Sequence, residues 1–291
     1  MSLKDKVVVV TGSSKGIGFE IAKEFSEVNG AHVIVCSRTL KQSEMAAKNI
    51  NGSTLPLEVD VTSESSVKKF IQKIVERFNR IDVLVNNAGY PFDESIWNKQ
   101  LHEGTTEELW KIIEVDLMGA IRLTRAAIPI MLKQNDTHSI QNKKDSLNIE
   151  VNSKLYGLKT TEMISPDNSS DQTPTAGVIV TISSTPAISG HIGGFPYTIA
   201  KAGNISLTKC IAKEYGNRNI RAYSLALGNI ATKATYEAIT EEVRNQAAKE
   251  APMKRWGRPN EVAKVAACIA DDNFSFATGN TIVIDGGTVL L

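Results

Sequence analysis

The stretch VVVVTGSSKGIG, residues 7–18, decides the fold class of this chain. It begins with an uninterrupted β-branched run, which is typical of a strand buried on both faces. Three glycines follow, and apolar residues then recur every three or four positions from Ile17 to Val28, as on one face of a helix. A strand that turns through glycines into a helix is either a tight structural turn or a site for a pyrophosphate, which the N–H groups of the helix N-terminus would bind.

The alternation of strand and helix continues along the chain. The sequence predicts strands at 31–36, 54–59, 81–85, 177–182, 220–225 and 281–284, and helices at 42–50, 65–78, 106–132, 197–215 and 260–269. Such alternation implies right-handed crossovers and a parallel sheet covered by helices on both faces. We therefore predict an α/β fold with a doubly wound parallel sheet, the Rossmann type.

Residues 133–176 interrupt this pattern with a segment rich in Asn, Ser, Thr, Asp and Lys. Connections in such folds usually take about 2–6 residues, so we predict a polar insertion before the fifth strand of a single domain, 1–291. Its middle, 147–158, alternates weakly and could form a hairpin. Because it enters the amino end of a strand, we expect it opposite the active site, either as part of an assembly or as a tolerated surface loop.

Composition narrows the class of protein. The chain of 291 residues is 42% hydrophobic and has a formal net charge of +1, which indicates neither a nucleic-acid nor a membrane partner. Without a signal-peptide pattern or a long apolar run, it is expected to be cytoplasmic. The three cysteines are expected to be buried apolar residues in a reducing compartment. No metal site is predicted, because no metal-ligand spacing occurs among His32, His102, His138 and His191.

Several motifs, in order, resemble those of the short-chain dehydrogenase/reductase family. The glycine loop reads TGxxxGxG at 11–18 in place of GxGxxG, and NNAG at 86–89 follows the fourth strand. YxxxK at 197–201 lies thirteen residues after Ser184, and DGG at 285–287 ends the last strand. The resemblance is closest to 3-oxoacyl-carrier-protein reductases. It implies an oxidoreductase that interconverts a carbonyl and a secondary alcohol by hydride transfer.

The resemblance assigns catalytic roles to Ser184, Tyr197 and Lys201, with Asp116 at a fourth position. Helical i,i+4 spacing places Tyr197 and Lys201 on one face, so the ammonium can stabilise the phenolate. A free phenol has a pKa of about 10, and one charge at about 4 Å supplies about 4 kcal/mol of the stabilisation that catalysis needs. Tyr197 would act as general acid or base, and Ser184 would hydrogen-bond the reacting oxygen. An idle exposed Tyr–Lys pair is the alternative.

The resemblance also implies a nicotinamide cofactor, and the following residues are expected to bind it: Gly12, Ser14, Lys15, Gly16, Ile17, Gly18, Arg38, Asp60, Val61, Asn87, Tyr197, Lys201, Ile230 and Thr232. No acidic residue lies between Val33 and Thr39 to accept a ribose hydroxyl, whereas Arg38 and Lys15 offer cations to a 2′-phosphate. NADP(H) is therefore the predicted cofactor. The alternative is that both cations are merely solvated surface charges.

Two positions depart from the family pattern. Asp116 stands where the family usually has an Asn of a proton relay. Its backbone carbonyl can still hold a relay water, whereas a buried carboxylate would need a partner and would alter the pH dependence. Leu227 stands where a Pro usually precedes Gly228, which predicts a less rigid loop. We therefore expect reduced but real activity.

The substrate pocket is expected to be shaped by two segments, 91–104 with Trp97 and His102, and 233–253, with His191 nearby. Trp256 is expected to be an anchor in the core or an interface. A homotetramer or homodimer is implied by the resemblance, which pairs the helices 106–132 and 197–215. A sugar or polyol dehydrogenase remains an alternative. So does a catalytically weak cofactor-binding sensor or scaffold.

Overall fold

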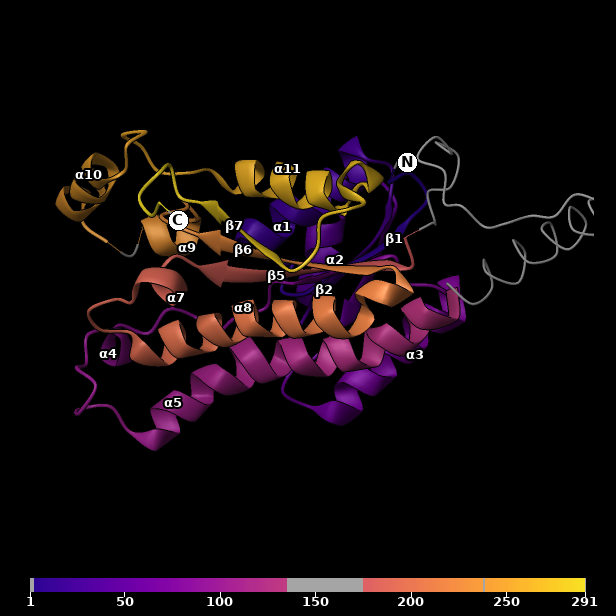
Figure 1. Cartoon of the computed structure of the whole chain (residues 1–291), viewed down its shortest axis with the longest axis horizontal. Coiled ribbons are helices and arrows are strands. Elements are labelled where there is room, and N and C mark those ends of the chain that lie inside the picture. The colour runs from indigo at the N-terminus through magenta and orange to yellow at the C-terminus, as the bar shows by residue number, and fades with distance from the viewer. Residues whose placement is uncertain (1–2, 135–174, 238, 291) are drawn as a thin grey trace, which may run out of the picture.

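The computed structural model describes residues 3–134, 175–237 and 239–290 (Figure 1). Within them, seven parallel strands form one sheet in the order β3-β2-β1-β4-β5-β6-β7. The strands are β1 (Val7–Val10), β2 (His32–Ser37), β3 (Thr54–Glu58), β4 (Val83–Asn86), β5 (Gly177–Ser184), β6 (Ile220–Leu227) and β7 (Asn280–Ile284). This topology confirms the predicted doubly wound fold. β1 lies between β2 and β4, so the chain reverses its direction of travel across the sheet there.

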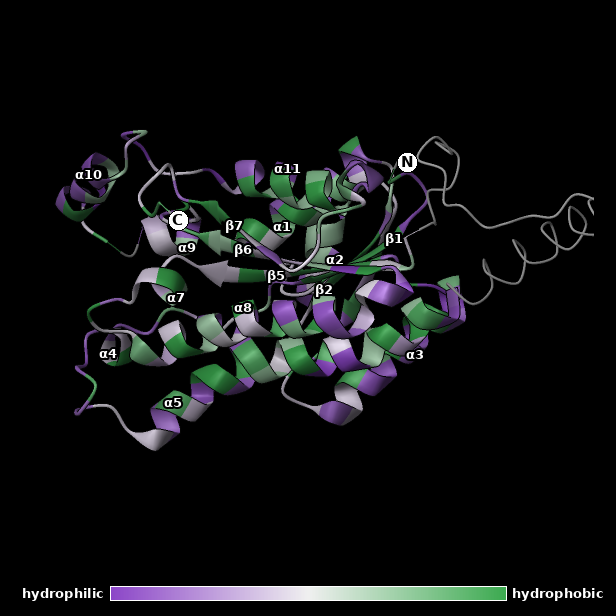
Figure 2. Ribbon diagram, in the orientation of Figure 1, coloured by the Kyte–Doolittle hydropathy of each residue, from purple (hydrophilic) through white to green (hydrophobic). Residues whose placement is uncertain are grey.

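Helices cover both faces of the sheet (Figure 1), and the strands and the helices that cover them carry many hydrophobic residues (Figure 2), which form two buried clusters. On one face lie α1 (Gly16–Lys23), α2 (Leu40–Ala47) and α11 (Pro259–Ala270). The other face carries α3 (Glu64–Phe78), α8 (Phe195–Tyr215) and a helical stretch over residues 119–134. Successive valines of β1 alternate between the two layers, because strand side chains point to opposite faces.

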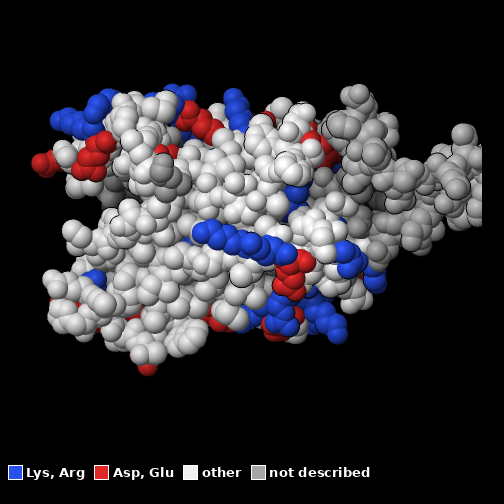
Figure 3. Space-filling model, in the orientation of Figure 1, with Lys and Arg blue, Asp and Glu red and all other residues white. Residues whose placement is uncertain are grey.

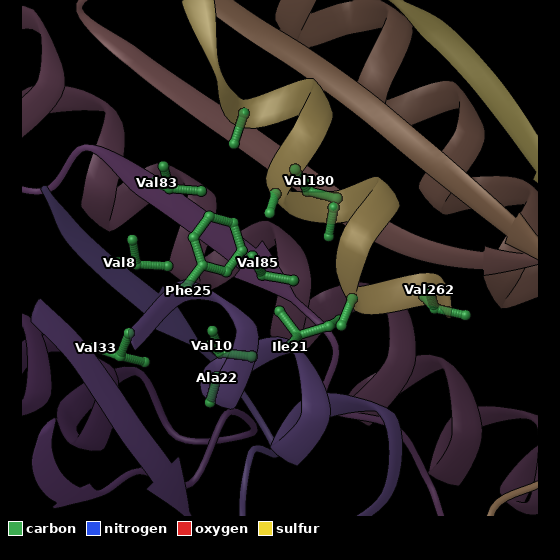
Figure 4. Packing of buried hydrophobic residues seen from close by; sticks show 14 of the residues in the cluster. Val8, Val10, Ile21, Ala22, Phe25, Val33, Val83, Val85, Val180 and Val262 are labelled. Atoms are coloured by element: carbon green, nitrogen blue, oxygen red, sulfur yellow. The ribbon is translucent and has the colours of Figure 1, made fainter. Parts of the chain in front are cut away.

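Figure 4 shows how α1, which follows the glycine-rich turn, packs into the core. Phe25, just beyond α1, and Ile21 on α1 are fully buried against valines of β1 and β4 and against α11. Because α1 begins directly after the turn, this packing fixes the direction in which the N-terminus of α1 points. Burying side chains of this size contributes about 1.5–3 kcal/mol each.

Two helices expected to be regular contain π-helical segments instead. The helix predicted from Ile17 to Val28 is α helical only in α1 and then widens into η1 (Glu24–Val28). The helix predicted over 106–132 is divided into α5 (Thr106–Ile113), a π-helical segment η2 (Glu114–Met118) and the stretch over 119–134. A π turn rotates the side chains that follow it, and such turns are frequent at functional sites. The apolar period alone does not indicate them.

Shorter elements complete the described part of the chain. They are α4 (Glu94–Trp97), α7 (Pro186–Ser189), α9 (Lys233–Tyr236), α10 (Glu241–Glu250) and the 3₁₀ turns η3 (Gly216–Arg218) and η4 (Asp272–Phe274). Among the described residues, none of the helices has the length and apolar character that crossing a membrane requires. Those residues also contain no cluster of metal-ligating side chains.

The expectation for the cysteines was wrong at two of three positions. Only Cys36 is buried, and burial raises the pKa of its thiol to about 12. Cys210 and Cys268 are exposed. Cys210 lies on the exposed side of α8 and Cys268 on that of α11.

The predicted insertion 133–176 and the hairpin at 147–158 lie almost entirely outside the described residues. Its two ends are described, and they lie together at the amino edge of β5. Gln134 accepts a hydrogen bond from the N–H of Ile81 (2.8 Å) and donates one to the carbonyl of Ala176 (3.2 Å). Both ends are therefore at the edge of the sheet opposite Ser184.

Candidate active site

The candidate site lies at the carboxyl ends of β1, β4, β5 and β6, next to the point where the strand order reverses. The glycine loop follows β1, NNAG follows β4, Ser184 ends β5, and Leu227 ends β6. Parallel strands bring these ends to one edge of the sheet, which is where ligands bind in open α/β sheets. The fold thus gathers residues that are far apart in sequence.

The glycine loop is locked to the NNAG turn by hydrogen bonds. The Thr11 hydroxyl accepts from the backbone N–H groups of Asn87 and Ala88, both at 2.9 Å. In return the Asn87 amide donates to the carbonyl of Thr11 at 2.8 Å. A Cβ at Gly18 would clash with this amide and lie 2.6 Å from the carbonyl oxygen of Gly12. Glycine at position 18 is therefore required for the close approach of the two turns.

The first turn of α1 presents its backbone N–H groups without a side-chain cap. Gly16 has φ +60°, a left-handed conformation that favours glycine, and the N-cap residue Lys15 makes no capping hydrogen bond. Thr232 faces Gly16, because a Cβ there would lie 3.7 Å from the Thr232 methyl group. Ile230 beside it is buried. These residues fit a cradle for an anionic phosphate group.

The other residues expected to bind the cofactor lie in the glycine loop and after the carboxyl ends of β2 and β3. Arg38 and Lys15 are both exposed and, among the described residues, form no ion pair. Asp60 is exposed, and its carboxylate accepts from the N–H of Thr62 at 3.0 Å, while Val61 is buried. Ser13 was not among the residues predicted from the sequence. Its buried hydroxyl donates to the carbonyl of Val10 at 2.6 Å and so fastens the loop to β1.

Lys201 is the centre of the polar network under the site. Its ammonium Nζ lies 5.4 Å from the centre of the Tyr197 ring, which confirms that the two side chains share one face of α8. The same Nζ lies 3.0 Å from Oδ2 of Asp116 and donates to the carbonyl of Ile182 at 3.2 Å. Only 5% of Lys201 is exposed. The ammonium is thus held by a carboxylate, a carbonyl and its neighbouring phenol.

The Asp116 carboxylate is enclosed from several sides. Its Oδ1 accepts from the backbone N–H of Tyr90 at 2.5 Å, and a Cβ at Gly89 would lie 3.3 Å from its Oδ2. The backbone carbonyl of Asp116, expected to hold a water, accepts from the Asn204 amide at 3.0 Å. Asp116 itself is 2% exposed. The π turn η2 and Gly89 together make room for this carboxylate beside Lys201.

Charge interactions determine the protonation of Lys201. Burial on its own lowers the pKa of the ammonium, but the Asp116 carboxylate and Tyr197 act in the opposite direction and hold the pKa above its usual value. Lys201 therefore stays positively charged throughout the neutral range.

Ser184 is held by Leu227, which stands where the family usually has a proline. Its hydroxyl donates to the carbonyl of Leu227 at 3.1 Å, and the backbone N–H of Thr185 donates to the same oxygen at 2.9 Å. Gly228 is fixed next to it, because its N–H donates to the carbonyl of Ile284 at 3.0 Å. The turn after β6 is therefore tied to both neighbouring strands without a proline.

Trp97 forms an aromatic wall beside Tyr197. Its ring centre lies 5.5 Å from that of Tyr197, 5.2 Å from that of His191 and 5.8 Å from that of Phe92. A Cβ at Gly194 would collide with the Trp97 ring. The sequence placed Trp97 in a pocket-forming segment but not against the tyrosine, whereas His102 of the same segment is exposed.

The segment 233–253 is anchored within the chain by Trp256. The indole N–H of Trp256 donates to the carbonyl of Arg244 at 3.0 Å, and its ring meets that of Tyr236 edge-on at 5.4 Å. These contacts join α9, α10 and the start of α11. Trp256 thus acts as an anchor here and makes no ring contact with the aromatic wall in the described part of the chain.

Comparison with known proteins extends the similarity along the whole chain. Residues 6–142 match the family described as short chain dehydrogenase, and residues 144–289 match that described as enoyl-(acyl carrier protein) reductase. The 3-oxoacyl-(acyl-carrier-protein) reductase FabG of Thermotoga maritima is 33% identical over 294 residues, which cover 100% of both chains. Its namesake in Chlamydia trachomatis is 31% identical over 98% of both chains. Glucose 1-dehydrogenase 2 of Bacillus subtilis is 28% identical over 99% of this chain and 96% of that one.

Proposed function

This chain belongs to the short-chain dehydrogenase family and is an oxidoreductase that acts on carbonyl and CH–OH groups with a nicotinamide cofactor, and from this premise we propose its reaction. We propose that it uses NADP(H) to reduce 3-oxoacyl thioesters. The observation that carries the chemical part of this proposal is the network of Tyr197, Lys201 and Asp116 at the carboxyl edge of the sheet. The substrate class is supported by the relatives and by the apolar wall beside Tyr197.

Each catalytic side chain has a role in this reaction. A nicotinamide cofactor, when held by these residues, would supply the hydride for reduction and accept it in oxidation. Tyr197 donates the proton that the substrate oxygen gains on reduction and removes it on oxidation. The Lys201 ammonium stabilises the phenolate that remains after proton donation. Ser184 turns its hydroxyl from the carbonyl of Leu227 to the substrate oxygen and stabilises the negative charge that develops there.

The donors of Lys201 also explain how this residue would hold the cofactor. An ammonium has three N–H donors, and in this structure Asp116 and the carbonyl of Ile182 accept from two of them. The third is left for a ribose hydroxyl of the cofactor. The cradle of Gly16, Thr232 and the first turn of α1 would hold the pyrophosphate.

The preference for NADP(H) is proposed from the residues after β2. This strand ends at Ser37, and the next residue, Arg38, is exposed and, within the described residues, lacks an ion-pair partner. Its guanidinium would bind a 2′-phosphate through two parallel hydrogen bonds, and Lys15 would add a second cation. A carboxylate, which would favour the 2′-hydroxyl of NAD, is lacking between Val33 and Thr39.

An acyl substrate is favoured over a polyol by the surface around Tyr197. Phe92, whose ring contacts that of Trp97, is 50% exposed. Ile192 is 97% exposed and lies two residues before Gly194, whose N–H donates to the carbonyl of Trp97. Exposed apolar side chains next to a site bind apolar substituents, because contact removes their surface from water. A polyol would instead need hydrogen-bonding groups there.

We also propose that 1–291 works as one domain in a cytoplasmic homodimer or homotetramer. The helices α5 and α8 pack side by side on the outer surface (Figure 1) and expose Trp110 and Ile199. Figure 3 shows few charged side chains over the first half of α8. An uncharged, partly apolar helical surface is suited to a second copy of the chain. The exposed thiols of Cys210 and Cys268 fit a reducing compartment.

The experiment that tests this function follows NADPH oxidation with acetoacetyl thioesters, keto sugars, diketones and aldehydes as substrates. We expect turnover with the thioesters. Tyr197→Phe removes the general acid, so it should reduce kcat by roughly 1,000-fold or more. The affinity for NADPH should stay unchanged. Binding of NADPH without turnover of any carbonyl would overturn the proposal in favour of a cofactor-binding sensor. Turnover of keto sugars alone would favour the sugar dehydrogenase.

A further inference from the structure

The Asp116 carboxylate is a buried charge for which the proposed reaction has no step. We propose that Asp116 is a fixed counter-charge to Lys201, a positioning residue that shifts turnover to higher pH and favours carbonyl reduction over alcohol oxidation at neutral pH. This inference rests on the proposed function, because it concerns the same tyrosine. It follows from the placement of one carboxylate, which the family pattern does not contain at this position.

Both oxygens of the Asp116 carboxylate contact hydrogen-bond donors. Its two oxygens face the Lys201 ammonium at 3.0 Å and the N–H of Tyr90 at 2.5 Å, and both partners are donors. A protonated carboxyl would place its own hydrogen against one of them. A buried carboxylate with an opposite charge and a backbone donor is the stable form, because both interactions favour the negative charge.

The groups around the pair come from every element that packs against it. From α8 come Lys201, Tyr197 and the neutral Asn204, and from the turn after β4 come Gly89 and the backbone N–H of Tyr90. β5 contributes the carbonyl of Ile182, which accepts from the ammonium, and the hydroxyl of Ser183, which donates to the backbone carbonyl of Lys201. In the described residues, Asp116 and Lys201 are therefore the charged pair of this network, and the Tyr197 phenol is the titratable group beside it.

The consequence for Tyr197 follows from the signs of the charges. The ammonium 5.4 Å from the Tyr197 ring centre favours the phenolate, but a negative charge 3.0 Å from that ammonium opposes it. The ion pair is neutral as a whole, so its effect on the phenol is weaker than that of a lone lysine. The Asp116 carboxylate therefore opposes formation of the Tyr197 phenolate, which favours the acid needed for reduction over the base needed for oxidation.

Asp116→Asn tests this inference, because the amide keeps the shape and removes the charge. We expect the rising limb of the oxidation profile against pH, and the falling limb of the reduction profile, to move to lower pH by roughly one unit. The ratio of oxidation to reduction rate at pH 7 should rise by about 10-fold. Asp82→Asn is the control, because Asp82 is a buried carboxylate paired with Arg80 and Lys6 at the opposite edge of the sheet and should leave both limbs in place.

A second measurement is independent of turnover. Ultraviolet titration of tyrosine in the protein without cofactor, with the trace of Tyr197→Phe subtracted, gives the midpoint of the Tyr197 phenol directly. We expect this midpoint also to fall in Asp116→Asn. An unchanged or higher midpoint, in a variant that keeps its fold by circular dichroism, would overturn the counter-charge. Absence of turnover in the unmodified protein would overturn the proposed reaction while leaving this titration to decide the role of Asp116.

Discussion

Arg38 is a single exposed side chain on which the choice of cofactor is expected to depend. In Arg38→Ala, the 2′-phosphate of NADPH loses charge-assisted hydrogen bonds worth about 1.5–3 kcal/mol, so KM for NADPH should rise by at least 10-fold. KM for NADH should stay within about twofold, because NADH has no such phosphate. Steady-state kinetics with both cofactors measures the difference.

Lys48→Ala is the matched control for this change. Lys48 is also exposed and basic, but it lies at the C-terminal end of α2, whereas Arg38 precedes its N-terminus. The control should leave both KM values unchanged. Equal loss of NADPH and NADH binding in Arg38→Ala would contradict a 2′-phosphate contact and indicate damage to the loop.

Residues of the site differ in how far the sequence predicts them. Tyr197 and Lys201 lie four positions apart in one helix, so local spacing is enough to place them on one face. The ion pair of Lys201 with Asp116 joins residues 85 positions apart, and it depends on how η2 packs against α8. Spacing carries no information about such a contact. The sequence marked Asp116 as a departure but could not decide between its carbonyl and its carboxylate.

At the scale of elements, the aromatic wall joins α4 to the start of α8. The carbonyl of Trp97 accepts from the N–H of Gly194 at 2.7 Å, and the residue that follows Gly194 begins α8. Gly193 and Gly194 both have positive φ, and both positions lack the space for a Cβ because Trp97 occupies it. Trp97 therefore fixes the first turn of the helix that carries Tyr197.

Trp97→Ala should affect both catalysis and substrate choice. Loss of the ring contacts, worth about 0.5–1.5 kcal/mol each, should loosen the turn before Tyr197 and lower kcat for short 3-oxoacyl thioesters by about 10-fold. The cleared space should raise kcat/KM for long or branched acyl chains relative to short ones. A series of thioesters of increasing chain length measures this ratio.

Phe276→Ala serves as the control, because Phe276 is a fully exposed aromatic residue that precedes β7 at the amino edge of the sheet. It should leave the chain-length profile unchanged. A parallel loss of rate for every chain length in Trp97→Ala would show that Trp97 supports the helix but does not line the pocket.

The elements themselves were predicted to different degrees for physical reasons. Continuous runs rich in β-branched residues indicated β1, β2, β4 and β5, because a strand buried on both faces has a continuous apolar sequence. β3 and β7 are only partly buried, and their place in the alternation of strand and helix was the stronger signal. The end of α3 at Asn79, which has φ 53°, fits the left-handed cap that asparagine tolerates. The π turns η1 and η2 were not predicted, since widening a helix by one residue leaves the apolar period almost unchanged.

At the scale of the whole molecule, the two sides of the sheet defined by the carboxyl ends and by the amino ends of its strands, called here the carboxyl edge and the amino edge, carry different features. The carboxyl edge holds the candidate site. The amino edge holds the ends of the predicted insertion and a buried cluster in which Asp82 accepts two hydrogen bonds from Arg80 and one from the N–H of Val7. The sequence predicted this division from the direction of the strands, because a connection from helix to strand returns to the amino edge in every βαβ unit.

The whole molecule is expected to form a dimer or tetramer through the exposed surface of α5 and α8. Trp110 on α5 is 56% exposed, and Ile199 on the neighbouring α8 is 47% exposed. If these helices pair with those of a second copy, a charge at their centre must be buried without a partner and becomes costly. Light scattering should therefore give a mass of twice or four times the 31.6 kDa chain, and Trp110→Glu should lower it. Val28→Glu, on the exposed side of η1, introduces the same charge away from this surface and should leave the mass unchanged. A Trp110→Glu protein that keeps the full mass would place the interface elsewhere.

Because Tyr197 and Lys201 lie on α8, a variant that loses its partner should also lose activity if pairing of this helix fixes the geometry of the site.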